Sequence, residues 1–105
     1  MIRKISARVL KNKKLRAWSM RSRVRLGIMA YLAGADEADF ATLKQKLELT
    51  DGNLSVHLKK LEEAGFVAVD KRFVDRKPVT RARMTEAGRD AFIAYLDAMA
   101  ALVKG

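Results

Sequence analysis

The hydrophobic pattern of the chain changes from a helical to an alternating period at Gly65, and this change limits the folds that it can adopt. Before Gly65 the apolar residues recur every three or four positions, which is the spacing of amphipathic helices. After it, residues 66–73 alternate and are rich in β-branched and aromatic side chains, which is typical of a strand. A chain of 105 residues is long enough for one domain with one core. We therefore expect one domain of the α+β class, mainly α-helical with a small β-hairpin.

Three short helices are predicted between residues 22 and 65. Each begins with a small polar residue whose side chain can bond the free N–H groups of the first turn. The capping residues are Ser22, Asp39 and either Thr50 or Asp51. Their helices are expected to end near Ala33, Glu48 and Gly65. Behind each cap the apolar residues follow a helical spacing, so each helix should bury one face.

The third of these helices divides into a packing face and a free face. At about 100° per residue, Leu54, Leu58 and Leu61 form one apolar stripe. The rest of the helix carries Gly52, Asn53, Ser55, Val56, Lys59, Lys60 and Glu63. Such side chains can read a DNA major groove, because Asn bonds adenine, Val touches a thymine methyl and Lys reaches guanine or phosphate. An ordinary solvated helix face has a similar composition, so the helix alone leaves both interpretations open.

A second alternating segment, residues 79–84, is predicted to pair with residues 66–73 as a β-hairpin. The intervening residues 75–78 have the composition of a turn and place Arg76 and Lys77 at a solvent-facing tip. Both cations could contact a nucleic acid, or they could keep an exposed strand edge soluble. The returning strand carries two further cations on one face, Arg81 and Arg83. They either contact phosphates or are merely solvated charges.

The last helix is predicted from Glu86 to about Lys104, with Thr85 as its cap. Its second half is interrupted mainly by Asp97 and Lys104, so it is apolar on nearly all sides. Such a helix is covered either within its own chain or by a second copy, and a symmetric homodimer is the favoured interpretation. The residues expected to form the dimer contact are Phe92, Tyr95, Leu96, Met99, Leu102 and Val103.

The positive charge of the chain is concentrated at its beginning. Ten Lys and Arg residues and no acidic residue precede Asp36, whereas 12 basic and 12 acidic residues balance from there on. We therefore separate a basic arm, residues 1–20, from the domain of residues 21–105. An excess of this kind predicts a polyanionic partner, either a nucleic acid or an anionic membrane surface. A mitochondrial transit peptide and a solvated tail are the other interpretations of the arm.

A membrane-spanning role is not expected. The most apolar run, residues 91–103, contains Asp97 and is shorter than the roughly 20 residues that a spanning helix needs. The absence of cysteine suits a reducing cytoplasm, and it removes disulfides, thiolate nucleophiles and zinc fingers. A cytoplasmic protein without metal or cofactor is therefore expected.

Catalytic residues are not apparent in the sequence. The single histidine, His57, falls at the edge of the leucine stripe, where a partly buried, hydrogen-bonded side chain is expected. Glu62 and Glu63 point about 100° apart on a helix and do not converge on one substrate atom. Because the chain also lacks a phosphate-binding glycine loop and a nucleophile elbow, we expect no enzymatic activity.

Two sequence blocks resemble a known family. LTDGNLSVHLKKLEEAGFV, residues 49–67, is similar to the recognition helix of winged-helix DNA-binding domains and to its exit into the wing. FVDRKPVTRARMTEAGR, residues 73–89, is similar to the wing tip, the returning strand and the start of the last helix. The resemblance is to the MarR- and ArsR-like transcriptional regulators, over about residues 22–103. It implies a winged helix-turn-helix with a C-terminal dimerisation helix.

The resemblance also implies a function and a site. The expected protein is a dimeric, sequence-specific regulator with its recognition helix in the major groove of double-stranded DNA and its basic wing on the minor groove or backbone. The residues expected to contact DNA are Thr50, Gly52, Asn53, Ser55, Val56, Lys59, Lys60, Arg76, Lys77 and Arg81. A winged-helix module that binds RNA or another protein is the alternative, although Trp18 is the only aromatic among the cations of the arm.

Overall fold

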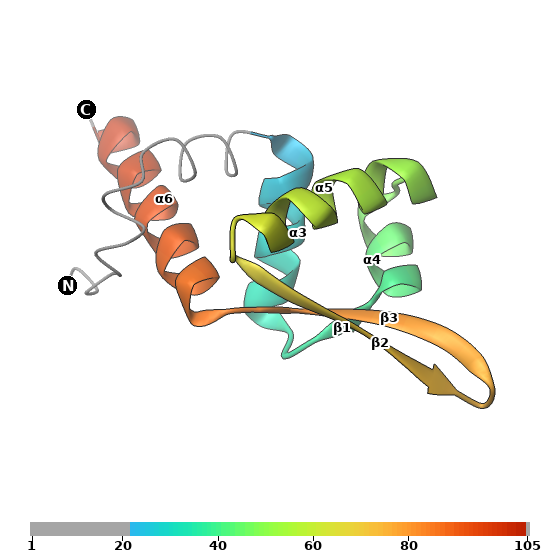
Figure 1. Ribbon diagram of the computed structural model, residues 1–105. Coiled ribbons are helices and arrows are strands. Elements are labelled where there is room, and N and C mark those ends of the chain that lie inside the picture. The colour runs from blue at the N-terminus through green and yellow to red at the C-terminus, as the bar shows by residue number, and fades with distance from the viewer. Residues whose placement is uncertain (1–21, 105) are drawn as a thin grey trace.

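The computed structural model describes residues 22–104, which form four helices and a three-stranded antiparallel sheet (Figure 1). The elements in order are α3 (Arg23–Gly34), β1 (Ala38–Asp39), α4 (Phe40–Leu47), α5 (Asp51–Glu63), β2 (Val67–Val74), β3 (Lys77–Met84) and α6 (Glu86–Lys104). The predicted α+β class is confirmed. The basic arm, residues 1–20, lies outside the described residues.

The helices begin at polar residues that cap them. A side-chain oxygen of each capping residue accepts a hydrogen bond from the N–H three positions further on, at 2.7 to 3.4 Å. The capping residues are Ser22, Asp39, Thr50 and Thr85. The predicted helix starts are therefore confirmed, and the choice between Thr50 and Asp51 falls to Thr50. Each such cap stabilises a helix by about 1 kcal/mol.

The sheet contains one strand more than the predicted hairpin. β1 pairs with β3, with Ala38 opposite Ala82 and Asp39 opposite Arg81, so the strand order is β1-β3-β2. The turn of the hairpin is also shorter than predicted. It consists of Asp75 and Arg76, both with positive φ, and Lys77 already belongs to β3.

The core lies where α3, α4 and α5 meet the inner face of the sheet and the start of α6. Figure 1 shows α3 between α6 and α4, with α5 packed across it. Fully buried core residues include Ile28, Met29, Leu32, Leu43, Leu54 and Leu61, and Leu58, Phe66, Val67 and Ala82 are nearly so. The predicted leucine stripe of α5 is thus confirmed, and each such side chain contributes about 1.5 to 3 kcal/mol through burial.

Only the first half of α6 belongs to this core. Phe92 is 8% exposed and packs in the core, and Tyr95 is half-buried against it. From Leu96 to Val103 every residue is exposed. The structure therefore places Phe92 in the core of its own chain, whereas the sequence prediction placed it in a dimer contact.

Candidate nucleic-acid interface

A tight turn joins α4 to α5. Glu48 has a left-handed backbone conformation, with φ 54° and ψ 51°, and its N–H donates to the carbonyl oxygen of Gln45. The N–H of Leu49 donates to the carbonyl oxygen of Lys44 at 3.0 Å. An ion pair of 2.9 Å between Lys44 Nζ and Asp51 Oδ1 bridges the turn. Together α4 and α5 therefore form a helix-turn-helix.

The side of α5 that faces away from the core carries most of the predicted site residues. The exposed ones are Gly52, Asn53, Ser55, Val56 and Lys59. Their spacings place them on adjoining parts of the helix surface. The apolar side chain of Val56 is 53% exposed among these polar neighbours, which suits contact with a thymine methyl group. Thr50 is also exposed, although its Oγ1 is already the capping acceptor for Asn53.

A polar contact links α5 to α3. Nη1 of Arg25 lies 3.0 Å from Nδ1 of His57. Because a guanidinium carries no acceptor, Nδ1 of His57 accepts this bond and the ring proton sits on Nε2. Burial, followed by the charges of Arg25 and Lys60, lowers the pKa of His57 from its ordinary value of 6.5. The predicted partly buried, hydrogen-bonded histidine is confirmed. Lys60, a predicted site residue, is half-buried, and its charge acts on the ring of His57.

The β2–β3 hairpin extends beyond the helices (Figure 1). Every residue from 70 to 78 is exposed. Arg76 lies in the turn itself, and Lys77 follows as the first residue of β3, opposite Val74. Both cations therefore stand at the tip, where the sequence places them.

A groove separates α5 from the hairpin. It has a volume of about 300 Å³ and runs between Ser55, Lys59 and Glu62 of α5 and Val69, Lys71 and Thr80 of the hairpin, and Phe40 and Leu58 complete its lining. Two cations from different elements, Lys59 and Lys71, thus line one channel together with two hydroxyl groups and the carboxylate of Glu62, so the lining keeps one excess positive charge. Such a lining can hold a phosphodiester backbone.

Of the polar residues that line the groove, Glu62, Lys71 and Thr80 were not among the predicted site residues. The signal for Lys71 was present, because Val67, Val69 and Lys71 alternate on one face of β2. Once Val67 is known to be buried, the same face must turn Lys71 towards the helices further along the strand.

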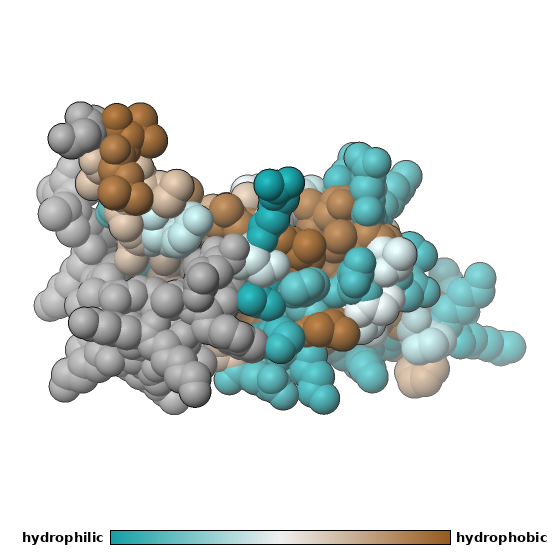
Figure 2. All heavy atoms as spheres, turned by 90° about the horizontal axis from the view of Figure 1, so that it is seen from above, coloured by the Kyte–Doolittle hydropathy of each residue, from teal (hydrophilic) through white to brown (hydrophobic). Residues whose placement is uncertain are grey.

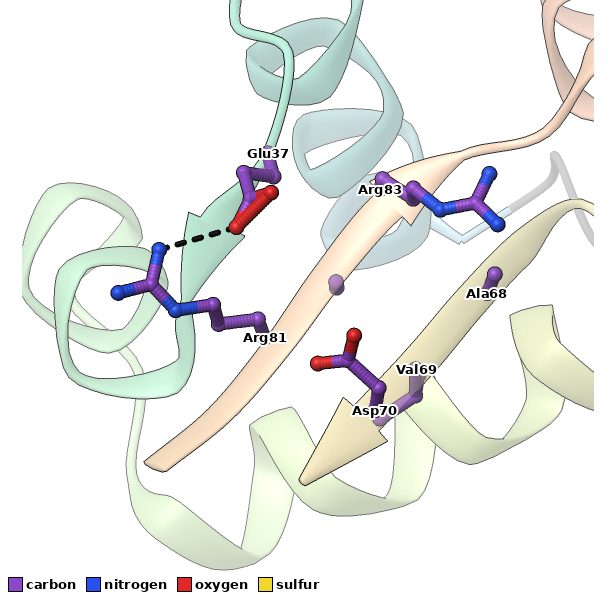
Figure 3. A pocket seen from close by; sticks show the side chains of 7 residues that line it. Glu37, Ala68, Val69, Asp70, Arg81 and Arg83 are labelled. Atoms are coloured by element: carbon purple, nitrogen blue, oxygen red, sulfur yellow. Dashed lines mark hydrogen bonds and ion pairs between the residues drawn. The ribbon is translucent and has the colours of Figure 1, made fainter. Parts of the chain in front are cut away.

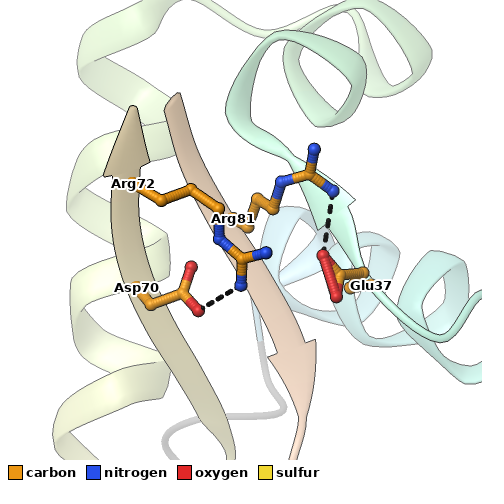
Figure 4. A network of polar contacts seen from close by, with 4 residues as sticks. All are labelled: Glu37, Asp70, Arg72 and Arg81. Atoms are coloured by element: carbon orange, nitrogen blue, oxygen red, sulfur yellow. Dashed lines mark hydrogen bonds and ion pairs between the residues drawn. The ribbon is translucent and has the colours of Figure 1, made fainter. Parts of the chain in front are cut away.

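Arg81 lies on the other face of the sheet. Its neighbour Ala82 is buried in the core, and strand residues alternate, so Arg81 points away from α5. Nη1 of Arg81 donates to Oε1 of Glu37 at 2.9 Å, and Nη2 of Arg72 donates to Oδ2 of Asp70 at 2.7 Å (Figure 4). The structure therefore does not bring Arg81 together with the other predicted site residues.

A shallow pocket of about 170 Å³ lies beside Arg81 on this outer face (Figure 3). It is lined by Glu37, Ala68, Val69, Asp70, Arg81, Ala82 and Arg83. The Nε of Arg81 is buried and has no hydrogen-bond partner among the described residues. Two carboxylates balance two guanidinium groups, so the pocket lacks the excess positive charge that a polyanion requires.

The helix-turn-helix and the basic hairpin have counterparts in known proteins. Residues 24–103 match the family model of the winged helix DNA-binding domain. The chain belongs to this winged-helix family. It shares 48% identity over 73 residues with an uncharacterised protein of Methanocaldococcus jannaschii, covering 70% of this chain and 79% of that one.

Two solved structures show the same winged-helix fold. A transcriptional regulator homologue from Pyrococcus horikoshii is 33% identical, with a TM-score of 0.80 over 93% of this chain and 96% of that one. The transcriptional repressor BigR from Xylella fastidiosa is 22% identical, with a TM-score of 0.65 over 88% and 89% of the two chains. The predicted resemblance to winged-helix regulators is confirmed.

Membership of the winged-helix family gives names to two elements of the fold. In this fold α5 is the recognition helix and the β2–β3 hairpin is the wing.

Between residues 22 and 104, no helix is both long and apolar enough to cross a bilayer. The same part of the chain holds no group of three or more His, Cys, Asp or Glu residues that could bind a metal ion.

Proposed function

We propose that the protein is a transcriptional regulator that binds a specific sequence of double-stranded DNA as a homodimer. The recognition helix enters the major groove, and the wing reaches the minor groove or the backbone beside it. The groove between α5 and the wing carries this proposal, because Lys59 and Lys71 face one channel from its two sides. With α5 in the major groove and the wing at the neighbouring minor groove, the DNA strand that separates the two grooves runs between α5 and the wing.

The exposed face of α5 suits base reading. Recognition helices contact base edges mainly through their N-terminal residues, which here include Gly52, Asn53 and Val56. Apart from its chain neighbours and the backbone of its own helix, Gly52 has no atom within 4 Å of the position that a Cβ would occupy, so the helix presents an open surface there. Asn53 can bond an adenine with both atoms of its amide, and Val56 can contact a thymine methyl. These residues supply sequence preference, whereas Lys59 supplies phosphate affinity.

The homodimer rests on the exposed part of α6. Figure 2 shows hydrophobic side chains gathered at the far end of this helix. Leu96, Met99 and Val103 follow the spacing i, i+3, i+7 and share one stripe, with Leu102 beside them. Apolar side chains in such a row are covered when two copies pair symmetrically. A dimer of this kind carries two recognition helices, which suits a palindromic site.

Selection of bound duplexes from a randomised pool tests the proposal. We expect the wild-type protein to enrich one inverted-repeat sequence. Asn53→Ala should lose preference at one base position per half-site, at a cost of about 1 to 3 kcal/mol on the preferred duplex. Gln45→Ala on α4 is the matched control, because it truncates an exposed amide away from the N-terminal turns of α5.

Three outcomes separate sequence reading from the other possibilities. An unenriched pool contradicts sequence-specific binding. An equal loss by Asn53→Ala on preferred and random duplexes means that Asn53 positions the protein without reading a base. Tighter binding of single-stranded RNA than of the selected duplex favours the alternative of an RNA-binding winged helix.

A further inference from the structure

The most exposed aromatic side chain among the described residues stands near the tip of the wing. Phe73 is 77% exposed and pairs across the hairpin with Pro78, which is exposed as well. A phenyl ring left in water gives up the stabilisation that burial of its apolar surface would bring. No core contact in the described part of the chain accounts for an aromatic residue at this position.

Phe73 and Pro78 lie on the face of the wing that turns towards the recognition helix. Lys71 opposes Thr80 in the sheet register, and Phe73 opposes Pro78 two positions further along. Because strand residues alternate, all four side chains share one face. Lys71 and Thr80 line the groove beside α5, and Pro78 and Thr80 line a neighbouring pocket beside Phe40. The pair of Phe73 and Pro78 therefore continues the DNA-facing groove towards the tip.

Cations surround this apolar pair on the wing. Lys71 precedes it on the same face, and Arg76 and Lys77 follow it at the turn. A partner that fits must combine negative charge with a groove that has apolar walls and admits the edge of a hairpin. The minor groove of DNA has these properties, because two phosphate rows flank deoxyribose walls and stacked bases. Phe and Pro are among the side chains that act as wedges at base steps in minor grooves.

We propose that Phe73, supported by Pro78, is a wedge that enters the minor groove, partly opens one base step and bends the bound duplex. The inference rests on the proposed DNA binding and adds a second source of sequence preference, at a position that the recognition helix does not touch. Pyrimidine–purine steps unstack easily, whereas A-tracts are stiff. The wedge therefore favours a flexible step, such as TA, at the place where the wing meets the DNA.

End-to-end fluorescence transfer on labelled duplexes of about 30 base pairs tests the wedge. The duplexes are variants of the selected site, with either a TA step or an A-tract under the wing. We expect the wild-type protein to bend the TA duplex and to bind it about tenfold more tightly than the A-tract duplex. Phe73→Ala should remove both the bend and this preference. Phe73→Leu, which keeps an apolar wedge, should retain most of both.

Val74→Ala is the matched control. Val74 is the next residue of the same strand, it is 40% exposed, and it lies on the opposite face of the wing. The Val74→Ala variant should bend the TA duplex and prefer it over the A-tract duplex as the wild-type protein does. Because Phe73 and Val74 are exposed and outside the core, both variants should keep the wild-type melting temperature, which confirms folding.

Four results would overturn the wedge. The first is a Phe73→Ala variant that bends and discriminates like the wild-type protein, and the second is a Val74→Ala variant that loses both properties equally. The third is a change of oligomeric mass in Phe73→Ala, which would make Phe73 a self-association contact. The fourth is Phe73-dependent binding to vesicles of anionic phospholipid in the absence of DNA. Failure of the wild-type protein to bind any duplex contradicts the proposed function itself and is thus distinguishable from all four.

Discussion

The backbone of Gly88, in the first turn of α6, lies directly against the carbonyl group of Phe66, with no room for a side chain between them. The same carbonyl oxygen accepts the N–H of Thr85 at 3.0 Å, and the Thr85 hydroxyl donates to the carbonyl oxygen of Gly65 at 2.7 Å. The root of the wing and the start of the last helix are therefore held together through backbone groups. The close approach therefore requires a glycine at position 88.

Gly88→Ala should destabilise the fold by about 2 kcal/mol or more, even though alanine is the better helix former by about 1 kcal/mol. An added Cβ would overlap the Phe66 carbonyl, which belongs to the backbone and cannot rotate away. Urea denaturation measures the change. Gly52→Ala is the control, because a Cβ there meets nothing within 4 Å, and it should leave stability equal or slightly higher. Equal stabilities of Gly88→Ala and the wild-type protein would contradict the close packing.

His57 should make the stability of the fold depend on pH. Its pKa is lowered in the folded state from 6.5, so between the two pKa values the unfolded chain binds more protons. The free energy of unfolding is therefore highest above about pH 6.5, and it falls as the pH drops from this value towards the lowered pKa of His57. Urea midpoints at about pH 7.5 and about pH 5.5 reveal the loss.

A His57→Gln variant is the control for this pH dependence. Glutamine does not titrate, and its side-chain oxygen can still accept from Arg25. The hydrogen bonds to Thr42 lower the pKa of Asp39 from its ordinary value of 3.8. Asp39 therefore changes stability only below about pH 3.8 and does not affect the comparison between about pH 5.5 and about pH 7.5. The same fall in the variant as in the wild-type protein would assign the effect to another group.

Lys71 and Arg81 should differ in their effect on DNA affinity. Lys71→Ala removes a cation from the groove and should flatten the slope of log affinity against log salt by about 0.9. Arg81→Ala removes a cation that is already paired with Glu37 on the other face, so its slope should stay unchanged. Filter-binding titrations over a range of salt concentrations measure both slopes. Equal slopes for the two variants would contradict the assignment of the groove to the DNA backbone.

Leu96→Glu or Met99→Glu should dissociate the proposed homodimer, because each variant buries a charge in an apolar contact. Light scattering at micromolar concentration measures the mass. Ala101→Glu places the same charge on an exposed position on the opposite side of the helix and should leave the dimer intact. A wild-type protein that scatters as a folded monomer would contradict the dimer.

Arg76→Gly should stabilise the fold and weaken DNA binding together. Arg76 has a φ of 68°, a conformation that costs a residue with a side chain about 1 to 2 kcal/mol and costs glycine nothing. Lys77→Gly is the control, since it removes a neighbouring cation from a strand position where glycine brings no relief. Urea denaturation and the salt slope are measured for both. A loss of stability in Arg76→Gly would show that the turn is held by the arginine side chain.

The helices could be read from the sequence because their signals are local. Ser22, Asp39, Thr50 and Thr85 each bond an N–H three residues away, so cap and helix are adjacent in the chain. β1 has no such signal. Its two residues are too few to show a period, and they are a strand only because β3 lies beside them.

At Phe92, the hairpin turn and Arg81, the structure also differs from the sequence predictions because local sequence signals do not determine these features. A helix that is apolar on all sides does not reveal which side its own core covers, so Phe92 was grouped with the exposed residues of α6. The turn at Asp75 and Arg76 lacks the Asn-Gly signature of a two-residue hairpin loop, and the presence of Pro78 suggested a longer one. Arg81 could be assigned to a face of its strand, but its ion pair with Glu37 depends on the pairing of β1 with β3, which places Asp39 opposite Arg81.

The exposed part of the wing, from residue 70 to residue 78, contributes nothing to the core. Its length and side chains can therefore be exchanged by grafting without disturbing the packing of the helices. Substitutions there escape the purifying selection that folding imposes on the leucine stripe of α5. Under the proposed function, related proteins can thus diverge in the DNA sites that they bind through wing changes alone, while the framework that carries the wing stays the same.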